Sequence, residues 1–288
     1  MSCPQCFSGH VNPGTPLGRI ETIHGRQTYI AEPPDGKPPK GIVVILHDAF
    51  GLPFVNNQIL ADHYASLGQY LVYLPDFLDG TQASVKTMTN MALLFDKKTS
   101  WLWAPYYLIS VALDLGPFLI RNRPTVAWPK ITSWFKSLRE DKSLDLPIGV
   151  AGFCWGGLYS IMLSQNAAES RTSSGQALAD AFFGAHVSNV TVPQDIEKVT
   201  LNFSLATGDD DAVMDMKQVK QVQEVLKRKE GSVDSEVVIY PGAKHGFAVR
   251  ASRAEPDSQE TKQAEEAEKQ AIAWFQRQFE KVKRGESS

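Results

Sequence analysis

The most regular feature of the chain is an alternation between short apolar runs and longer segments with apolar residues at helical spacing. Apolar runs of strand length occur at 25–33, 42–51, 70–76, 146–154, 181–188, 201–211 and 235–247. Segments with helical periodicity lie at 56–68, 125–141, 156–168, 215–231 and 260–283. Runs rich in Val and Ile, such as 42–51, are typical of strands buried on both faces of a parallel sheet. The pattern therefore predicts an α/β fold with a mostly parallel central sheet flanked by helices.

The longest helical pattern lies near the C-terminus, where Ile272, Phe275, Phe279 and Val282 share one apolar stripe. No internal repeat or long linker interrupts the alternation, and 288 residues fit within the size range of one α/β domain. We therefore expect a single domain over 1–288.

One segment departs from the alternation. Residues 101–120, WLWAPYYLISVALDLGPFLI, are almost long enough to span a bilayer. Asp114 near the middle, together with Pro105 and Pro117, argues against a membrane span. We expect instead a helical, aromatic-rich insert over 95–128, whose helices pack against the core or form a cap over a pocket.

Composition and charge narrow the classes of function. The net charge is −3 and no stretch is strongly basic, so a nucleic-acid partner is not expected. The first residues, MSCPQCFSGH, lack the basic and apolar regions of a signal peptide, which predicts a cytoplasmic protein with reduced thiols. Cys3 and Cys6 form a C-x-x-C pair with His10 nearby, but a fourth zinc ligand is not evident. We therefore expect neither a metal nor another cofactor.

A candidate nucleophile sits in the stretch GFCWGG at 152–157. This stretch places Cys154 between the end of a predicted strand and the start of a helix, where ligands bind in parallel sheets. Such a sharp turn requires small residues two before and two after the nucleophile, and Gly152 and Gly156 meet that demand. The helix N-terminus lowers a thiol pKa, and the amide of Trp155 is placed to face an oxyanion. A buried cysteine with a packing role is the alternative.

An acid and a base follow the cysteine in chain order. Asp210 and Asp211 lie in an aspartate-rich turn after one predicted strand, and His245 lies on the loop after the next strand. Both loops belong to the same edge of the sheet as Cys154. Histidine supplies a base and a carboxylate fixes its tautomer. We favour Asp211 as the acid, with Asp210 as second choice; turn or helix capping is the alternative role for these aspartates.

Together these residues resemble the dienelactone hydrolase family, within the α/β-hydrolase superfamily. GFCWGG is similar to that family's nucleophile elbow, which carries cysteine, and ATGDDDAV is similar to its Gly-x-x-Asp turn. HDAFGL (47–52) resembles the exit of its first buried strand. KHGFAVR (244–250) and CFSGHVNPGTPLG (6–18) resemble the histidine loop and the leader of its fungal members. The likeness extends over nearly the whole chain.

The resemblance implies hydrolysis of an ester or lactone by a triad of Cys154, His245 and Asp211. It also implies that the amides of Ala49 and Trp155 form the oxyanion hole. The small-molecule substrate is then an ester or lactone.

The resemblance also implies accessory positions at the substrate site, namely Asp48, Phe50, His186 and Arg250. Asp48 takes the place of a bacterial glutamate that holds the resting thiol, and it is one methylene shorter. Bacterial members grip a substrate carboxylate with an arginine four residues after the histidine. Here Val249 occupies that position and Arg250 follows it, so a carboxylated dienelactone is not the expected natural substrate.

The sequence favours a cysteine hydrolase that acts through a thioester on an enol-lactone-like substrate. The aromatic insert suggests that this substrate is hydrophobic or aromatic. Two alternatives stay open: a non-hydrolytic ligand-binding or redox-sensing protein on the same fold, and an isomerase or dehydratase of a biosynthetic pathway with His245 as base. No membrane partner is expected, and the oligomeric state is open, a homodimer being one alternative.

Overall fold

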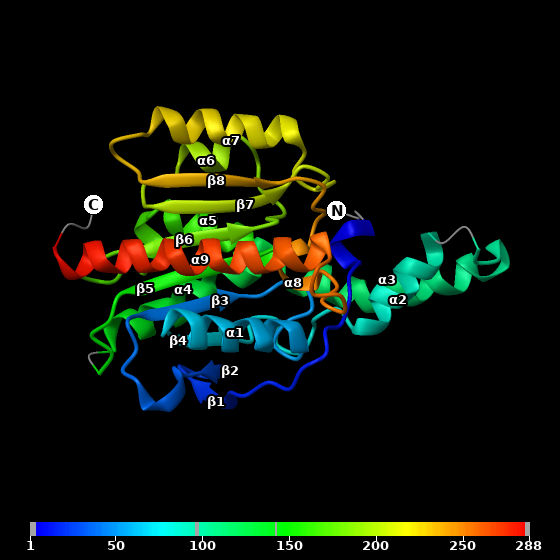
Figure 1. Cartoon of the computed structure of the whole chain (residues 1–288), viewed down its shortest axis with the longest axis horizontal. Coiled ribbons are helices and arrows are strands. Elements are labelled where there is room, and N and C mark those ends of the chain that lie inside the picture. The colour runs from blue at the N-terminus through cyan, green and yellow to red at the C-terminus, as the bar shows by residue number, and fades with distance from the viewer. Residues whose placement is uncertain (1–3, 96–97, 142, 286–288) are drawn as a thin grey trace.

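In a computed structural model of the chain, which describes residues 4–95, 98–141 and 143–285, the strands form one sheet (Figure 1). The described strands are β1 (Arg19–Ile23), β2 (Arg26–Ala31), β3 (Ile42–Leu46), β4 (Leu71–Pro75), β5 (Ile148–Phe153), β6 (Ala181–Ala185), β7 (Phe203–Gly208) and β8 (Ser235–Tyr240). Their order is β1-β2-β4-β3-β5-β6-β7-β8. From β4 to β8 all pairs are parallel, whereas β1, β2 and β4 pair antiparallel. The predicted α/β fold with a mostly parallel sheet is confirmed.

The apolar runs of the sequence correspond to β2 through β8. Every residue of β3, β5, β6 and β7 is buried, as expected for central strands covered on both faces. The sequence analysis missed β1, Arg19–Ile23, because its side chains are exposed or half-buried and three of its five residues are polar. An exposed edge strand carries little hydrophobic signal.

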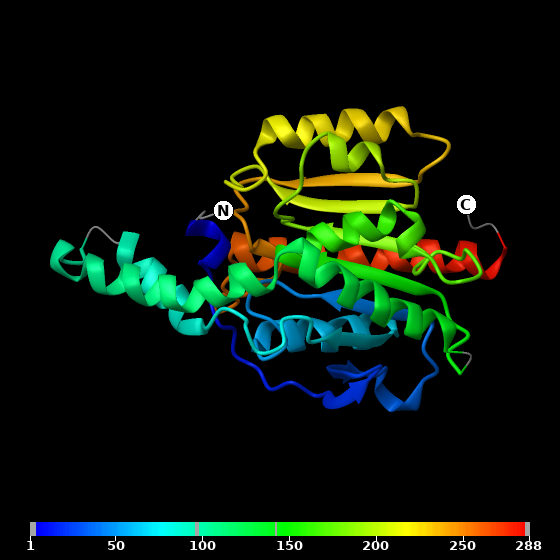
Figure 2. The ribbon, with the colours of Figure 1, turned by 180° about the vertical axis from the view of Figure 1, so that it is seen from behind.

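Helices cover both faces of the sheet (Figures 1 and 2). They are α1 (Val55–Gly68), α2 (Val85–Phe95), α3 (Ala104–Arg121), α4 (Pro124–Glu140), α5 (Trp155–Ser164), α6 (Gln194–Glu197), α7 (Met216–Arg228), α8 (Phe247–Arg250) and α9 (Gln259–Lys283), with a short 3-10 helix, η1, at Pro4–Phe7. Figure 1 shows α1 and α9 in front of the sheet, and Figure 2 shows α4 and α5 on the opposite face. The sheet is thus the middle of three layers.

The C-terminal helix α9 packs closely on the sheet. Phe275 and Phe279 of the predicted stripe are buried, whereas Ile272 and Val282 are half-buried. A Cβ atom at Gly149 would lie 2.6 Å from the Phe275 ring, and one at Gly41 would lie 2.4 Å from the Phe279 ring. The two glycines therefore allow the aromatic rings of α9 to approach the strands directly.

Because β3, β5, β6, β7 and β8 run parallel, the loops that follow them gather at one edge of the sheet. The described N-terminal segment, with η1, lies at the same edge (Figure 1). This edge holds the residues that the sequence analysis selected as catalytic.

Helices α2 and α3 form an arm that projects from this edge, away from the sheet (Figures 1 and 2). The insert predicted over 95–128 falls on α3 and the start of α4, and α4 already packs on the body of the protein. The aromatic residues at the far end of the arm were expected to pack or to line a pocket. Instead Trp101, Trp103 and Tyr106 are 80%, 58% and 59% exposed. Helix α3 packs along α2 and buries only one stripe of side chains: Val111, Leu115 and Phe118.

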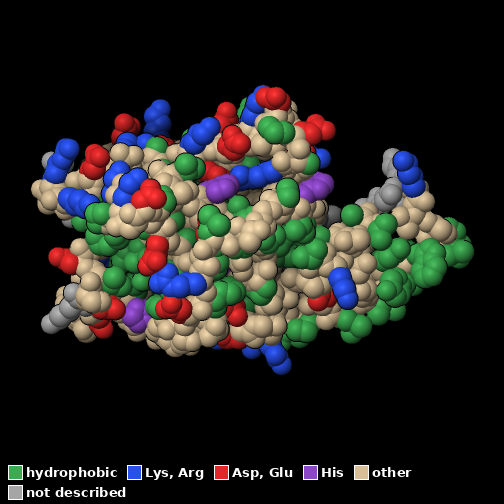
Figure 3. Space-filling view, turned by 60° about the horizontal axis from the view of Figure 1, so that its bottom comes forward, with side chains coloured by type: hydrophobic (Ala, Val, Ile, Leu, Met, Phe, Trp, Pro, Cys, Tyr) green, Lys and Arg blue, Asp and Glu red, His purple; other side chains and the backbone are tan. Residues whose placement is uncertain are grey.

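The rest of the surface of α3 is apolar. Figure 3 shows hydrophobic side chains gathered over the projecting arm. Leu102, Ile109, Leu113 and Ile120 are each at least 60% exposed. Trp101–Arg121 is the one described stretch that is long and apolar enough to cross a membrane by length and composition, and 17% of its most apolar window is buried. Asp114, the charge that argued against a membrane span, accepts a hydrogen bond from the amide of Ser84 at 2.8 Å.

Candidate active site

The candidate nucleophile Cys154 is the single residue between β5 and α5. Its backbone has φ 50° and ψ −112°, a conformation that residues other than glycine rarely adopt. At a sharp turn between a strand and a helix, this conformation directs the side chain of the nucleophile position out of the turn. A Cβ atom at Gly152 would lie 2.5 Å from the carbonyl oxygen of Gly156. One at Gly156 would lie 2.0 Å from the carbonyl oxygen of Leu46. Both positions therefore require glycine, as the sequence analysis inferred for a nucleophile elbow.

Gly156→Ala is expected to lower the free energy of unfolding by about 1–3 kcal/mol or more, because the backbone of β3 must move to admit the methyl group. The measurement is urea unfolding. Gly116→Ala is the matched control, since no atom lies within 4 Å of the Cβ position there. In α3 the alanine is expected to leave stability unchanged or raise it by up to about 1 kcal/mol. Equal stability of the two variants would contradict the close approach at the elbow.

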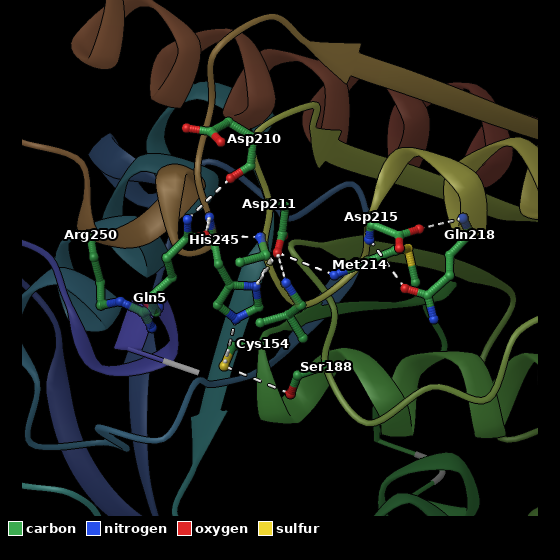
Figure 4. A network of polar contacts seen from close by, with 12 residues as sticks. Gln5, Cys154, Ser188, Asp210, Asp211, Met214, Asp215, Gln218, His245 and Arg250 are labelled. Atoms are coloured by element: carbon green, nitrogen blue, oxygen red, sulfur yellow. Dashed lines mark hydrogen bonds and ion pairs between the residues drawn. The ribbon is translucent and has the colours of Figure 1, made fainter. Parts of the chain in front are cut away.

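Asp211 and His245 meet Cys154 from two neighbouring loops (Figure 4). The Nε2 atom of His245 lies 3.2 Å from the sulfur of Cys154, and its Nδ1 atom lies 3.0 Å from Oδ2 of Asp211. All three side chains are buried. Asp210 is exposed, and its backbone oxygen accepts a hydrogen bond from Gln5. The geometry therefore selects Asp211 over Asp210 as the partner of the histidine.

Asp211 also accepts hydrogen bonds from backbone amides, as expected for an aspartate in a turn, and so does Asp215. Asp215 is the N-cap of α7 and forms a capping box with Gln218 (Figure 4). Asp211 accepts hydrogen bonds from the amides of Val213 at 2.8 Å and Met214 at 3.3 Å. These bonds fix the Asp211 carboxylate while its two oxygens remain in contact with His245.

Electrostatics favour a thiolate–imidazolium pair at neutral pH. A hydrogen bond from the Cys6 thiol lowers the pKa of Cys154 most; burial raises this pKa, but His245 and Arg250 lower it further, leaving it well below its usual range. Burial lowers the pKa of His245, but the Cys154 and Asp211 charges more than offset this and raise it to about 9. The two shifts act in the same direction, because each favours the charged form of its group.

The modification of Cys154 by iodoacetamide is expected to depend little on pH between about pH 6 and pH 8, because a lowered pKa keeps the thiolate populated at both values. An ordinary thiol with a pKa of about 8.5 would react roughly 80-fold more slowly at the lower pH. Peptide mapping at low conversion measures the rate for Cys154 alone. The same cysteine in urea-unfolded protein is the control and should show the ordinary dependence. A native rate that also falls about tenfold per pH unit would contradict the ion pair.

Ala49 lies three residues beyond the end of β3, and Trp155, the residue after Cys154, is the first residue of α5. Within the described part of the chain, neither amide donates a hydrogen bond. The indole of Trp155 is fixed by a hydrogen bond from Nε1 to the carbonyl of Asn122 at 3.0 Å and by stacking on His47. Two unused amides beside a thiolate are suited to bind a developing oxyanion.

Asp48 and Arg250 form a buried ion pair beside the triad, with Nη1 and Oδ2 2.7 Å apart. The other oxygen of Asp48 accepts hydrogen bonds from Asn57 and from the amide of Phe50, both at 3.1 Å. The Arg250 guanidinium lies over the Phe50 ring, 5.5 Å from its centre. Because these donors occupy the carboxylate, Asp48 does not hold the thiol in the way of the bacterial glutamate whose place it takes.

Arg250 was predicted to be a substrate-binding or accessory residue of the site. Its side chain is 1% exposed and it is committed to Asp48 and to the N-terminal segment. In this structure it offers no exposed surface to a substrate. Val249, which replaces the arginine of bacterial members, is also buried. The described site therefore presents no cation suited to a substrate carboxylate in these two positions.

His186 lies directly behind the triad histidine. Its ring centre is 5.2 Å from that of His245, and it also contacts Phe153 and Phe247. The side chain is fully buried and neither ring nitrogen has a hydrogen-bond partner in the described structure. Burial, followed by the positive charges of His245 and Arg250, lowers the pKa of His186 well below its usual value, so the ring is neutral. His186 therefore lines the site, and in the described structure it makes no hydrogen bond to the thiol of Cys154.

The sequence analysis missed the part that the N-terminal segment takes in the site. The Oε1 atom of Gln5 accepts hydrogen bonds from the amides of Ala212 at 3.0 Å and His245 at 3.1 Å. The only signal for this contact was the likeness of 6–18 to a family leader. Cys3 lies outside the described residues. Among those that are described, no group of three or more His, Cys, Asp and Glu side chains is arranged to hold a metal ion.

Two cavities of the described structure bear on access to the thiol. One of about 670 Å³ lies between α7 and β8, and Cys154 is not among its lining residues. A second cavity of about 540 Å³ is lined by the His245 loop, by residues 8–10 and by the start of α9. Cys154 is not among its lining residues and is 3% exposed.

Comparison with known proteins shows the family of the chain. A family model described as "Dienelactone hydrolase family" matches residues 121–279. The protein named hydrolase pyvD, from Aspergillus violaceofuscus, is 24% identical over 276 residues, which cover 96% of each chain. Hydrolase tropI, from Talaromyces stipitatus, is 26% identical over 276 residues, which cover 96% of this chain and 95% of its own.

A solved structure is similar in fold. It is a dienelactone hydrolase-like promiscuous phosphotriesterase from metagenomic libraries, with a TM-score of 0.58 and 18% identity, covering 91% of this chain and 98% of that one. The matched residues 121–279 include the candidate nucleophile, acid and histidine.

Proposed function

Because the chain belongs to the dienelactone hydrolase family, and is therefore a carboxylic ester or lactone hydrolase, we propose that Cys154 is its nucleophile in a triad with His245 and Asp211. One observation carries the proposal. The thiol, both nitrogens of the imidazole and the carboxylate form a continuous chain of contacts of 3.2 Å and 3.0 Å at a nucleophile elbow. This is the arrangement that nucleophilic catalysis requires.

The reaction proceeds in two steps. The Cys154 thiolate attacks the carbonyl carbon, and the oxyanion binds to the amides of Ala49 and Trp155. His245 donates its Nε2 proton to the leaving alkoxide or enolate, which leaves a thioester on Cys154. The neutral imidazole then removes a proton from water, and the hydroxide attacks the thioester and restores the thiolate. Asp211 holds the histidine tautomer in both steps.

The substrate class follows from the nucleophile. A thiolate is itself a good leaving group, so the first tetrahedral intermediate proceeds to the thioester most readily when the substrate's own leaving group is comparably stable. Esters with activated alcohols and enol lactones meet this condition best, whereas a peptide must first have its leaving amine protonated.

The surroundings of the nucleophile favour a hydrophobic or aromatic substrate. The base of the arm contacts the site through Phe118, whose ring centre lies 6.5 Å from that of Trp155. The Trp155 ring also packs against Tyr159. The exposed aromatic residues farther along the arm do not take part. Several predictions from the sequence remain predictions. They are a single domain over 1–288, a homodimer, the lack of nucleic-acid and membrane partners, and a cytoplasmic location.

Turnover of p-nitrophenyl acetate, with and without iodoacetamide, tests this function. We expect hydrolysis that is lost in proportion to alkylation of Cys154, and an added acetyl mass on the Cys154 peptide when the reaction is quenched in acid. Product analysis by mass must show addition of water, because an isomerase or dehydratase acting through His245 would not add it. Turnover that persists after complete modification of Cys154 would contradict the nucleophile.

A further inference from the structure

The N-terminal segment lies across the active site and is fastened to both catalytic loops (Figure 4). Gln5 of η1 accepts hydrogen bonds from the amides of Ala212 and His245, at 3.0 Å and 3.1 Å. Its amide nitrogen donates to the carbonyl of Asp210 at 3.2 Å. One side chain thus joins this segment to the residues next to Asp211 and to the histidine itself.

The buried arginine holds the same segment from the other side. The Nε atom of Arg250 donates to the carbonyl of Ser8 at 2.9 Å, and Nη2 donates to that of Gln5 at 3.4 Å. The ring of Phe7 packs edge-on against Phe50, with ring centres 6.3 Å apart. These contacts fix the short helix between the Asp48–Arg250 ion pair and the His245 loop.

This placement brings two cysteines together inside the protein. Cys6 is 4% exposed and Cys154 is 3% exposed, and neither is part of a disulfide. The Cys6 thiol hydrogen-bonds to the sulfur of Cys154, and both cysteines interact electrostatically with Arg250. A disulfide between them would require the two sulfur atoms to move from this contact to a separation of about 2.05 Å.

The segment also covers the nucleophile. Cys154, His245 and Asp211 are each 3% exposed, and the cavity on the outer side of the His245 loop stops short of the thiol. A segment that lies over the nucleophile and places a thiol beside it can be fixed in that position by one covalent bond.

We propose that Cys6 and Cys154 form a redox pair, which a hydroperoxide converts into a disulfide that fastens the N-terminal segment over the active site. The pair is a modification site that lies beyond ester or lactone hydrolysis. It depends on the reactivity of Cys154 and on the placement of Cys6, and needs no ester turnover.

The chemistry balances in two steps. The Cys154 thiolate attacks the terminal oxygen of the hydroperoxide and the O–O bond breaks. The departing alkoxide takes the proton of His245 and leaves as an alcohol, and Cys154 becomes a sulfenic acid. The Cys6 sulfur then attacks the sulfenic sulfur, and the S–O bond breaks. The departing hydroxide takes the Cys6 proton and leaves as water. Two thiols lose two electrons in total, and the hydroperoxide gains them.

Reversibility is the functional consequence. A sulfenic acid without a neighbouring thiol is oxidised further to a sulfinic acid, which thiol reductants do not reverse. Cys6 traps the sulfenic acid first, so the nucleophile is closed off but preserved. A dithiol restores both thiols by exchange, and hydrolysis returns.

The first test treats the reduced full-length protein with about one equivalent of hydrogen peroxide near pH 7, followed by alkylation and non-reducing peptide mapping. We expect a Cys6–Cys154 linked peptide, loss of two thiols, and loss of ester hydrolysis that dithiothreitol reverses. A sulfinic acid on Cys154, a Cys3–Cys154 link, or unoxidised Cys154 would each overturn the proposal. Mapping needs no hydrolysis, so the linked peptide also forms if the proposed ester reaction is wrong.

The second test compares Cys6→Ser with Cys3→Ser, each measured against its own starting activity. After peroxide and then dithiothreitol, Cys3→Ser is expected to recover almost fully. Cys6→Ser is expected to recover less than about a fifth and to carry about 32 Da of added oxygen on the Cys154 peptide. Equal recovery of the two variants would overturn the role of Cys6. The linked peptide in the parent protein is independent of whether either variant folds.

Discussion

Cys154→Ser is expected to lose at least about 100-fold in kcat/KM for activated esters, and Cys154→Ala at least about 10⁴-fold. The site is built around a thiolate–imidazolium pair, with the pKa of the thiol lowered and that of His245 raised to about 9. A serine hydroxyl does not ionise under these conditions, so it offers no charged nucleophile and no longer raises the pKa of the histidine. The alanine variant retains only the oxyanion hole and substrate binding.

Steady-state kinetics with p-nitrophenyl acetate measures both losses. Urea unfolding is the control, and both variants should unfold within about 1 kcal/mol of the parent because the elbow glycines are unchanged. The kcat/KM of the parent should also fall above about pH 9, where His245 loses the proton that it donates to the leaving group. A serine variant as fast as the parent would contradict the thiolate mechanism.

Much of the fold could be predicted because its central strands are covered on both faces. In β3, β5, β6 and β7 every residue is buried, so the corresponding runs of the sequence are mostly apolar. The predicted runs extend past the observed strands, since loop residues at this edge are apolar as well: the run at 42–51 continues through Ala49 and Phe50 beyond the end of β3. The exposed strand β1 lacks such a signal.

The triad was predictable because its spacing follows from the topology. In a parallel sheet each loop after a strand returns to the same edge, so Cys154, Asp211 and His245 had to lie near one another once β5, β7 and β8 were placed. The choice between Asp210 and Asp211 depends instead on the local turn, which directs one side chain to His245 and leaves the other exposed. Strand patterns carry no information on that direction.

Contacts between segments that are far apart in the chain could not be predicted from the sequence. Nothing in the pattern around Arg250 indicates that its guanidinium pairs with Asp48, 202 residues away, or that Gln5 reaches the loop of His245. The arm is a further case. The periodicity of α3 predicts a helix, but the side of the helix that finds a partner is decided by where α2 lies. Short-range patterns determine elements, and tertiary packing determines which of their faces are covered.

Asp211→Asn is expected to lower kcat/KM by about 10²–10⁴-fold. The asparagine amide donates where the carboxylate accepts, so it favours the histidine tautomer with the proton on the wrong nitrogen. It also removes a charge that raises the pKa of His245, and the ion pair with Cys154 weakens with it. Alkylation of Cys154 should then regain a clear dependence on pH between about pH 6 and pH 8.

Asp210→Asn is the matched control for this prediction, because it makes the same change one residue earlier. Asp210 is exposed and contributes only its backbone carbonyl to the site, through the bond from Gln5. Its activity and its alkylation profile are therefore expected to stay within about twofold of the parent, in line with an exposed side chain that touches no reacting group. If Asp210→Asn instead lost activity while Asp211→Asn kept it, the acid of the triad would be Asp210 and the turn after β7 would have to open during catalysis. Equal losses in both would mean that the charge of the turn matters more than the direction of either carboxylate.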